Sequence, residues 1–172
     1  METLAAFIVS TGVGNWVIAH DWVWPTAEII HFLGMSLLFG TIGLLDLRIL
    51  GMAKGLPIGQ LERLVPWGIV GFLLVISTGF LFVSGEQPSP LAFLQGNFSF
   101  RLKMTFILLA GLNALVFYVF GVSRQVDQLA PDADAGVGAK VIAATSLVLW
   151  VGVICLGRLI MYDATLLMAL GM

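Results

Sequence analysis

A carboxylate and an imidazole lie three residues apart in the first long apolar run of the chain, in the segment Trp24-Pro-Thr-Ala-Glu28-Ile-Ile-His31. In a helix this spacing places Glu28 and His31 on one face. An ionisable side chain inside a membrane segment is costly and needs a partner, so it marks a candidate functional site. Imidazole ligates haem iron, copper and zinc, and a neighbouring carboxylate can be a co-ligand or fix the tautomer. The alternative is a structural pair that ties this helix to Arg158 or Lys103.

The second histidine of the chain, His20, precedes this run. With Glu28 and His31 it could complete a mixed nitrogen and oxygen site that suits copper or zinc. In a continuous helix His20 would be roughly 16 Å from His31, so a shared site requires a chain break between Asp21 and Pro25. The sequence favours the alternative, an interfacial histidine among tryptophans. A di-iron site would need further carboxylates, which only an oligomer could supply.

Three more side chains are candidates for a haem environment. Met35 follows His31 by one turn and could be an axial ligand, although a methionine here is more often a packing residue. Lys103, near the start of the third apolar run, could bind a haem propionate or snorkel to the interface. Arg158 could be a bidentate partner of Glu28 or of a propionate.

At the far end of the first run, Asp46 is interpreted as an anchor that pairs with Arg63 or Arg124 across the loops, rather than as a catalytic group. Asn113 lies deep in the third run and is expected to hydrogen-bond across helices.

The composition identifies lipid as the solvent of this chain. Of 172 residues 59% are hydrophobic and 10% are charged, with a mean hydropathy of +1.03. Soluble proteins have about 25% charged residues. A net charge of -2 argues against a nucleic-acid partner. The single cysteine, Cys155, excludes an internal disulfide and a cysteine-based metal cluster.

Four apolar runs are long enough to cross a bilayer as helices, which takes roughly 20 residues each. They cover about residues 22–50, 64–84, 102–122 and 141–161. Residues 4–19 are shorter and interrupted by glycines, which predicts a helix lying in the interface. The prediction is an all-α integral membrane four-helix bundle with a short N-terminal interfacial helix, forming one domain over residues 1–172. Glycines recur along the runs and would let the helices approach closely.

Lysine and arginine near the ends of the runs predict the orientation. The first and third loops carry Arg48, Lys54, Arg63, Arg124 and Lys140, and the opposite side carries only Arg101, Lys103 and Arg158. Both termini are therefore expected outside the cytoplasm. The N-terminus lacks a basic leader segment and is interpreted as mature protein.

Several motifs resemble an uncharacterised family of small four-helix bacterial inner-membrane proteins. The resemblance covers about residues 15–160 and rests on Trp22-Val-Trp-Pro-Thr-Ala-Glu28-Ile-Ile-His31, Asp46-Leu-Arg48-Ile-Leu-Gly51, Pro66-Trp67-Gly-Ile-Val-Gly71 with Thr78-Gly79, Phe100-Arg-Leu-Lys103 and Asn113. A weaker likeness is to small haem-b membrane proteins of the HemJ protoporphyrinogen oxidase type, to which His31, Arg48 and Lys103 correspond. The surrounding motifs differ, so the likeness implies haem b binding through His31 and not the enzymatic activity.

The sequence thus predicts a membrane redox protein that binds haem b, alone or with copper, and transfers electrons or performs small-molecule redox chemistry at the outer face. His31, Met35, Lys103 and Arg158 are the candidate cofactor residues, and His31, Glu28 and His20 the candidate metal ligands. Membrane lipid, a homo-oligomeric partner and an unidentified electron donor or acceptor are the expected partners. The competing interpretation is a cofactor-free transport component or scaffold that uses Glu28 and His31 as a proton or structural site.

Overall fold

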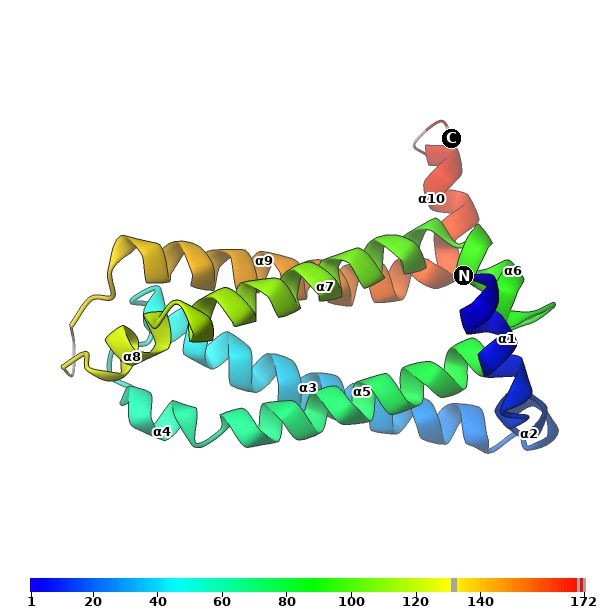
Figure 1. Ribbon diagram of the computed structural model, residues 1–172, viewed down its shortest axis with the longest axis horizontal. Helices are drawn as coiled ribbons and strands as arrows, with labels where there is room; N and C mark the ends of the chain where they lie inside the picture. Colours follow the sequence, from blue (N-terminus) through cyan, green and yellow to red (C-terminus); the bar gives the residue numbers. More distant parts are fainter. Residues whose placement is uncertain (131–132, 170, 172) are drawn as a thin grey trace.

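The computed structural model describes residues 1–130, 133–169 and 171, and in that part of the chain every regular element is a helix (Figure 1). The long helices are α3 (Val23–Ile49), α5 (Val65–Gly85), α7 (Phe98–Val119) and α9 (Val137–Leu159). The short ones are α1 (Glu2–Ser10), α2 (Val13–Ala19), α4 (Ile58–Glu62), α6 (Pro90–Gly96), α8 (Val122–Asp127), η1 (Ile160–Tyr162) and α10 (Asp163–Ala169).

Among the described residues, four helical segments are long and apolar enough to span a membrane, as the sequence predicts. They are Val23–Ile49, Ile58–Gly85, Phe98–Val119 and Val137–Thr165. The all-α four-helix membrane architecture is therefore confirmed. Because the number of these segments is even, the first and last helices, α1 and α10, lie at the same end of the bundle (Figure 1).

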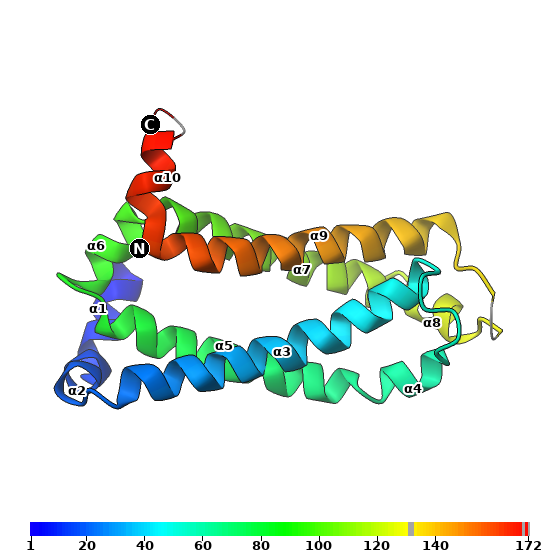
Figure 2. The ribbon, with the colours of Figure 1, turned by 180° about the vertical axis from the view of Figure 1, so that it is seen from behind.

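The N-terminal segment differs in detail from the single helix predicted over residues 4–19. It forms α1 and α2, which are bent by 60° relative to each other. The break falls at Gly12, whose φ of 70° lies in the left-handed region where glycine carries no steric penalty. Both helices lie across the end of the bundle in Figures 1 and 2, as expected for an interfacial segment. At this end α2 packs on α5, and α1 packs on α6.

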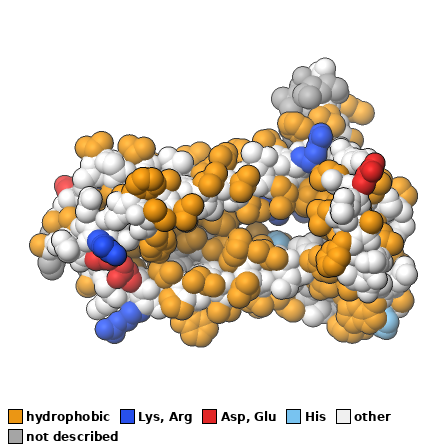
Figure 3. All heavy atoms as spheres, in the orientation of Figure 1, with side chains coloured by type: hydrophobic (Ala, Val, Ile, Leu, Met, Phe, Trp, Pro, Cys, Tyr) orange, Lys and Arg blue, Asp and Glu red, His pale blue; other side chains and the backbone are white. Residues whose placement is uncertain are grey.

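The bundle consists of two helix pairs rather than four equivalent neighbours. Helix α3 packs along α5, and α7 packs along α9 (Figure 2). The pairs meet mainly where α3 approaches α9, near the α4 and α8 end, while α5 and α7 barely touch. The surface is consequently hollowed between the two pairs, and Figure 3 shows a histidine and a basic side chain at the edge of this hollow.

The N-terminus of α7 is earlier than predicted because two side chains cap it. The Asn97 side chain accepts a hydrogen bond from the backbone N–H of Phe100. The Asp163 carboxylate accepts from the N–H groups of Phe98 (3.0 Å) and Ser99 (2.7 Å), although it belongs to the end of the fourth span. Helix starts leave such donors unsatisfied, so a carboxylate supplied from another element extends the helix to Phe98.

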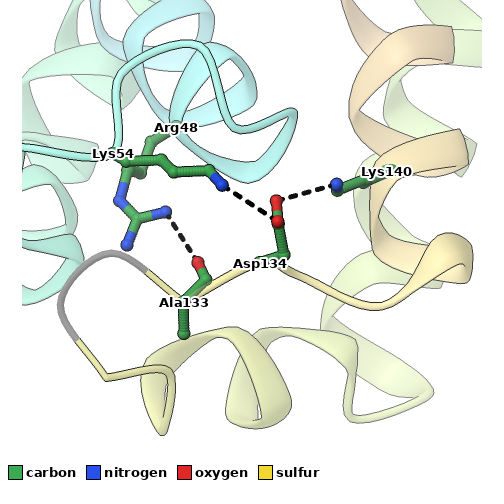
Figure 4. A network of polar contacts seen from close by, with 5 residues as sticks. All are labelled: Arg48, Lys54, Ala133, Asp134 and Lys140. Carbon is green, nitrogen blue, oxygen red and sulfur yellow. Dashed lines mark hydrogen bonds and ion pairs between the residues drawn. The ribbon is translucent and has the colours of Figure 1, made fainter.

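The loops at the opposite end are joined by a polar network (Figure 4). Arg48 is 1% exposed and donates to the carbonyl oxygens of Leu56 (2.9 Å) and Ala133 (3.4 Å). Asp134 accepts from Lys54 and Lys140 at 2.9 Å each. The expected pairing of Asp46 with Arg63 or Arg124 is wrong: within the described residues buried Asp46 forms no ion pair, and its Oδ2 has no hydrogen-bond partner. Asp46 points inward, whereas the loop charges gather on Asp134.

Candidate functional site

His31 lies on the face of α3 that packs against α5. The buried residues of this face are Ala27, Gly34, Leu38 and Thr41, and His31 falls into the same alternation of four and three residues. This is the spacing at which one helix keeps a continuous stripe toward a neighbour. His31 is partly buried as a result, and its ring lies 5.4 Å from the ring of Phe82 on α5.

The hydrogen bond between His31 and Thr78 determines which imidazole nitrogen is available. His31 Nδ1 is 2.7 Å from Thr78 Oγ1, and the same hydroxyl is 2.7 Å from the carbonyl oxygen of Leu74. A threonine hydroxyl has one hydrogen, and a carbonyl oxygen can only accept. Thr78 therefore donates to Leu74 and accepts from His31, which assigns the ring proton to Nδ1. The lone pair of Nε2 is then available to a metal or to a proton.

Lys103 contributes a positive charge to the same region from α7. It is partly buried and lies within Coulombic range of His31. Its ammonium lies against Gly157 of α9, where a Cβ atom would be only 3.2 Å from Nζ. No hydrogen bond or ion pair of this ammonium is found within the described part of the chain. Lys103 therefore crosses from α7 to α9 instead of extending to the interface, and it can bind an anionic group.

Glu28 is placed differently from His31. Three residues advance a helix by about 300°, which leaves a turn of about 60° between the two side chains. His31 lies on the α3–α5 seam, whereas Glu28 lies beside the seam and is exposed. The structure thus keeps the two on neighbouring parts of one helix surface but directs only the imidazole toward α5.

His20 occupies the interfacial environment that the sequence favours. Its Nδ1 is 2.8 Å from the carbonyl oxygen of Trp16, and its ring lies 5.3 Å from the Trp16 ring and 6.4 Å from the Trp22 ring. The chain does break between α2 and α3, as a shared site would require. Even so, the described residues contain no group of three His, Cys, Asp or Glu side chains that could hold a metal ion. One chain alone does not bring His20, Glu28 and His31 together.

The two remaining candidates lie in different settings. Met35 is partly buried one turn along α3 from His31. Arg158 is exposed at the end of α9, where its guanidinium is 3.4 Å from the Tyr162 hydroxyl and 5.4 Å from the Tyr162 ring centroid. Arg158 forms no ion pair with Glu28, so of its two expected partners the carboxylate of Glu28 is excluded, and a propionate stays a prediction.

Sequence reasoning missed Thr78 as the partner of His31. A signal was available, because Gly71 and Thr78 are seven residues apart, a spacing that places a small residue and a hydroxyl on one face of a helix. The structure buries both residues. A hydroxyl at that register faces the neighbouring helix. The sequence alone could not say which residue of α3 it would meet, because the relative axial position of two helices depends on how their surfaces interlock.

Comparisons of the chain with protein-family models, with curated proteins and with solved structures found no match.

Proposed function

We propose that this protein is a membrane redox protein that binds haem b, which Nε2 of His31 would hold through its iron. The observation that supports this most is the Nδ1–H donated by His31 to Thr78. Histidines that ligate metals usually donate their other ring N–H to a second group, which sets the ring orientation and raises the basicity of the ligand nitrogen. The hydrogen bond between His31 and Thr78 is made by the polypeptide alone.

Charge and access support the same proposal. Haem b carries two carboxylates, and a bilayer interior provides few counter-charges for them. Lys103 supplies an ammonium within Coulombic range of His31, and the hollow between the helix pairs gives the macrocycle a route from the lipid side (Figure 3). Bound haem would supply one-electron redox chemistry. The polypeptide would hold the ring through His31 and balance propionate charge through Lys103.

The experiment is an absorption spectrum of the protein purified from cells grown with ample haem. Wild type is expected to show a Soret band, and His31→Ala is expected to lose it while keeping its helical circular dichroism. His20→Ala is the matched control, because His20 already bonds to Trp16 and should leave the spectrum unchanged. A colourless wild type would overturn the proposal and favour the cofactor-free transport or scaffold alternative. Haem retained by His31→Ala would overturn the assignment of the ligand.

The proposal places the protein in the bacterial inner membrane with both termini outside the cytoplasm. The charge bias of the loops supports this orientation. It puts His31 and Lys103 toward the outer side, where an electron donor or acceptor would meet them.

We further propose a closed homo-oligomer. A macrocycle between the two helix pairs would be partly exposed to lipid unless a neighbouring subunit covered it. Identical subunits usually assemble with closed symmetry. Copper, the second candidate cofactor, would require such an assembly, because the described residues of one chain do not gather enough ligands.

A further inference from the structure

A cavity of about 470 Å³ lies between the four long helices, on the other side of the bundle centre from His31. His31 is not among its lining residues, and the cavity begins at Leu38, about 10 Å further along α3 by helical rise. Small-molecule sites in proteins typically measure about 300–1,000 Å³. The cavity is therefore large enough for a ring with substituents and is separate from the proposed haem site.

The cavity wall is apolar except for a few groups, of which Asp46 is the most unusual. Asp46 is 6% exposed and lines the cavity, and its Oδ2 has no hydrogen-bond partner among the described residues. Two more polar residues line it: Ser146 of α9, which is a hydrogen-bond neighbour of the Asp46 carboxyl group, and Asn113 of α7, whose amide already donates to the carbonyl oxygen of Ile142 (3.1 Å). A buried acceptor without a donor is costly. A ligand that brings a hydrogen-bond donor into the cavity would therefore satisfy Oδ2 of Asp46.

The opening of the cavity faces the lipid. Its lining residues on α3 and α9 include Thr41, Asp46 and Ala143, which are buried and form the floor. Its lining residues on α5 and α7 include Ile69, 55% exposed, and Tyr118, 54% exposed. Because α5 and α7 barely touch, the opening lies between them and leads sideways into the bilayer. A ligand that enters this way is membrane-soluble.

We infer that this cavity binds a membrane-soluble aromatic alcohol of the quinol type, with a ring hydroxyl donating to Asp46. Phe72, Phe117 and Trp150 line the walls and offer faces and edges against which a flat ring packs. The apolar tail of the bound ligand extends out of the cavity through the opening between α5 and α7. The oxidised form lacks the hydroxyl hydrogen, so the site favours the reduced form. This inference does not depend on the haem proposal.

The test compares a probe with hydroxyl donors and one without: a decyl-tailed hydroquinone, kept reduced without oxygen, and its dimethyl ether, in which methyl groups replace the hydroxyl hydrogens. Each is titrated into the full-length protein in lipid nanodiscs while tryptophan fluorescence is followed, and Trp150→Phe assigns the signal to the cavity. Wild type is expected to bind the hydroquinone about 10- to 100-fold more tightly than the ether. Equal binding of the two probes, or no binding, would overturn the inference.

Variants separate this site from the rest of the protein. Asp46→Leu is expected to abolish the preference for the hydroquinone, and Asp46→Asn, which keeps an acceptor oxygen, to retain part of it. His31→Ala should leave the preference unchanged, so failure of the haem proposal would be visible separately. Should Asp46→Leu not fold, Ala114→Trp at the exposed opening on α7 is expected to block both probes. Tighter binding of decylammonium than of the hydroquinone would assign the cavity to cations and contradict the inference.

Discussion

Gly34 of α3 and Gly71 of α5 face each other so closely that neither position has room for a side chain. A Cβ atom on Gly71 would lie 2.6 Å from the carbonyl oxygen of Gly34, and one on Gly34 would lie 2.9 Å from the carbonyl oxygen of Gly71. Both clashes involve backbone atoms, which cannot rotate away. This crossing sets the distance between α3 and α5, and therefore the hydrogen bond of His31 with Thr78 one to two turns away.

We expect Gly71→Ala to destabilise the protein by about 1–3 kcal/mol, because overpacking of a tight contact forces the backbones apart. Thermal unfolding in detergent, followed by circular dichroism, measures the effect. Gly79→Ala on the same helix is the matched control, because a Cβ atom there meets nothing within 4 Å. Equal unfolding temperatures for the two variants would show that the close crossing is not a source of stability.

Thr78→Val is expected to weaken haem binding about 10- to 100-fold, because it replaces the group that fixes the His31 tautomer with an apolar side chain of similar shape. Haem transfer to apomyoglobin, followed in the Soret region, measures the affinity. Thr78→Ser should restore it. Ser77→Ala is the neighbouring control, since Ser77 is exposed and bonds to Leu73 of its own helix. An unchanged affinity in Thr78→Val would contradict the assigned role.

The network around Asp134 predicts a pH dependence of stability. The ammonium groups of Lys140 and Lys54 lower the pKa of Asp134 from its ordinary value of 3.8 to about 2. In the unfolded chain this carboxyl binds a proton near its ordinary pKa, so its contribution is present above that pH and is lost as the pH falls to about 2. Because Asp134 is exposed, the contribution is small and decreases with salt.

The measurement is the unfolding temperature of wild type and of Asp134→Asn at pH 6 and near pH 2, at low salt. Wild type should be the more stable at pH 6, and the difference should vanish near pH 2. Asp21→Asn, which removes an exposed carboxylate at the opposite end of the bundle, is the control. A difference between wild type and Asp134→Asn that stays constant over this range would refute the pH dependence.

Both termini are expected outside the cytoplasm, because the loops at the α4 and α8 end carry more lysine and arginine than the other end. Alkaline phosphatase fused to the C-terminus, active only outside the cytoplasm, should be active, and the same reporter placed in the loop between α3 and α4 should be inactive. The reverse pattern would show that the protein has the opposite orientation in the membrane. The contacts of His31 would be the same in either orientation.

Native mass spectrometry from mild detergent is expected to release a homo-oligomer of one defined size, because closed symmetry ends growth at a fixed number of subunits. Dilution in detergent should leave this species intact if the cofactor helps to join the subunits. A monomer that still carries its cofactor would refute the expectation of a covered macrocycle.

The architecture could be predicted from the sequence because its cause is local. Apolar runs of sufficient length must form helices in lipid, where no water satisfies the backbone. The predicted first span, residues 22–50, accordingly differs from α3 by only a residue at each end. The need of His31 for a polar partner could also be predicted, because an ionisable side chain inside an apolar run is costly without one, and the structure pairs it with Thr78. The start of α7 at Phe98 could not be predicted, because its cap, Asp163, lies near the C-terminal end of the fourth span and is distant in the sequence.

What the tertiary structure decided is which polar groups meet. The sequence suggested Glu28 as the companion of His31, but an offset of about 60° is enough to leave Glu28 exposed while His31 contacts α5. Thr78 became the partner because the Gly34–Gly71 contact sets the axial position of α5 against α3. Asp46 was expected to anchor the loops through an arginine, but it is a buried residue of the cavity wall because α3 approaches α9 at that level. Helix formation depends on neighbours along the chain, whereas these pairings depend on how whole helix surfaces interlock, and a single sequence does not reveal that.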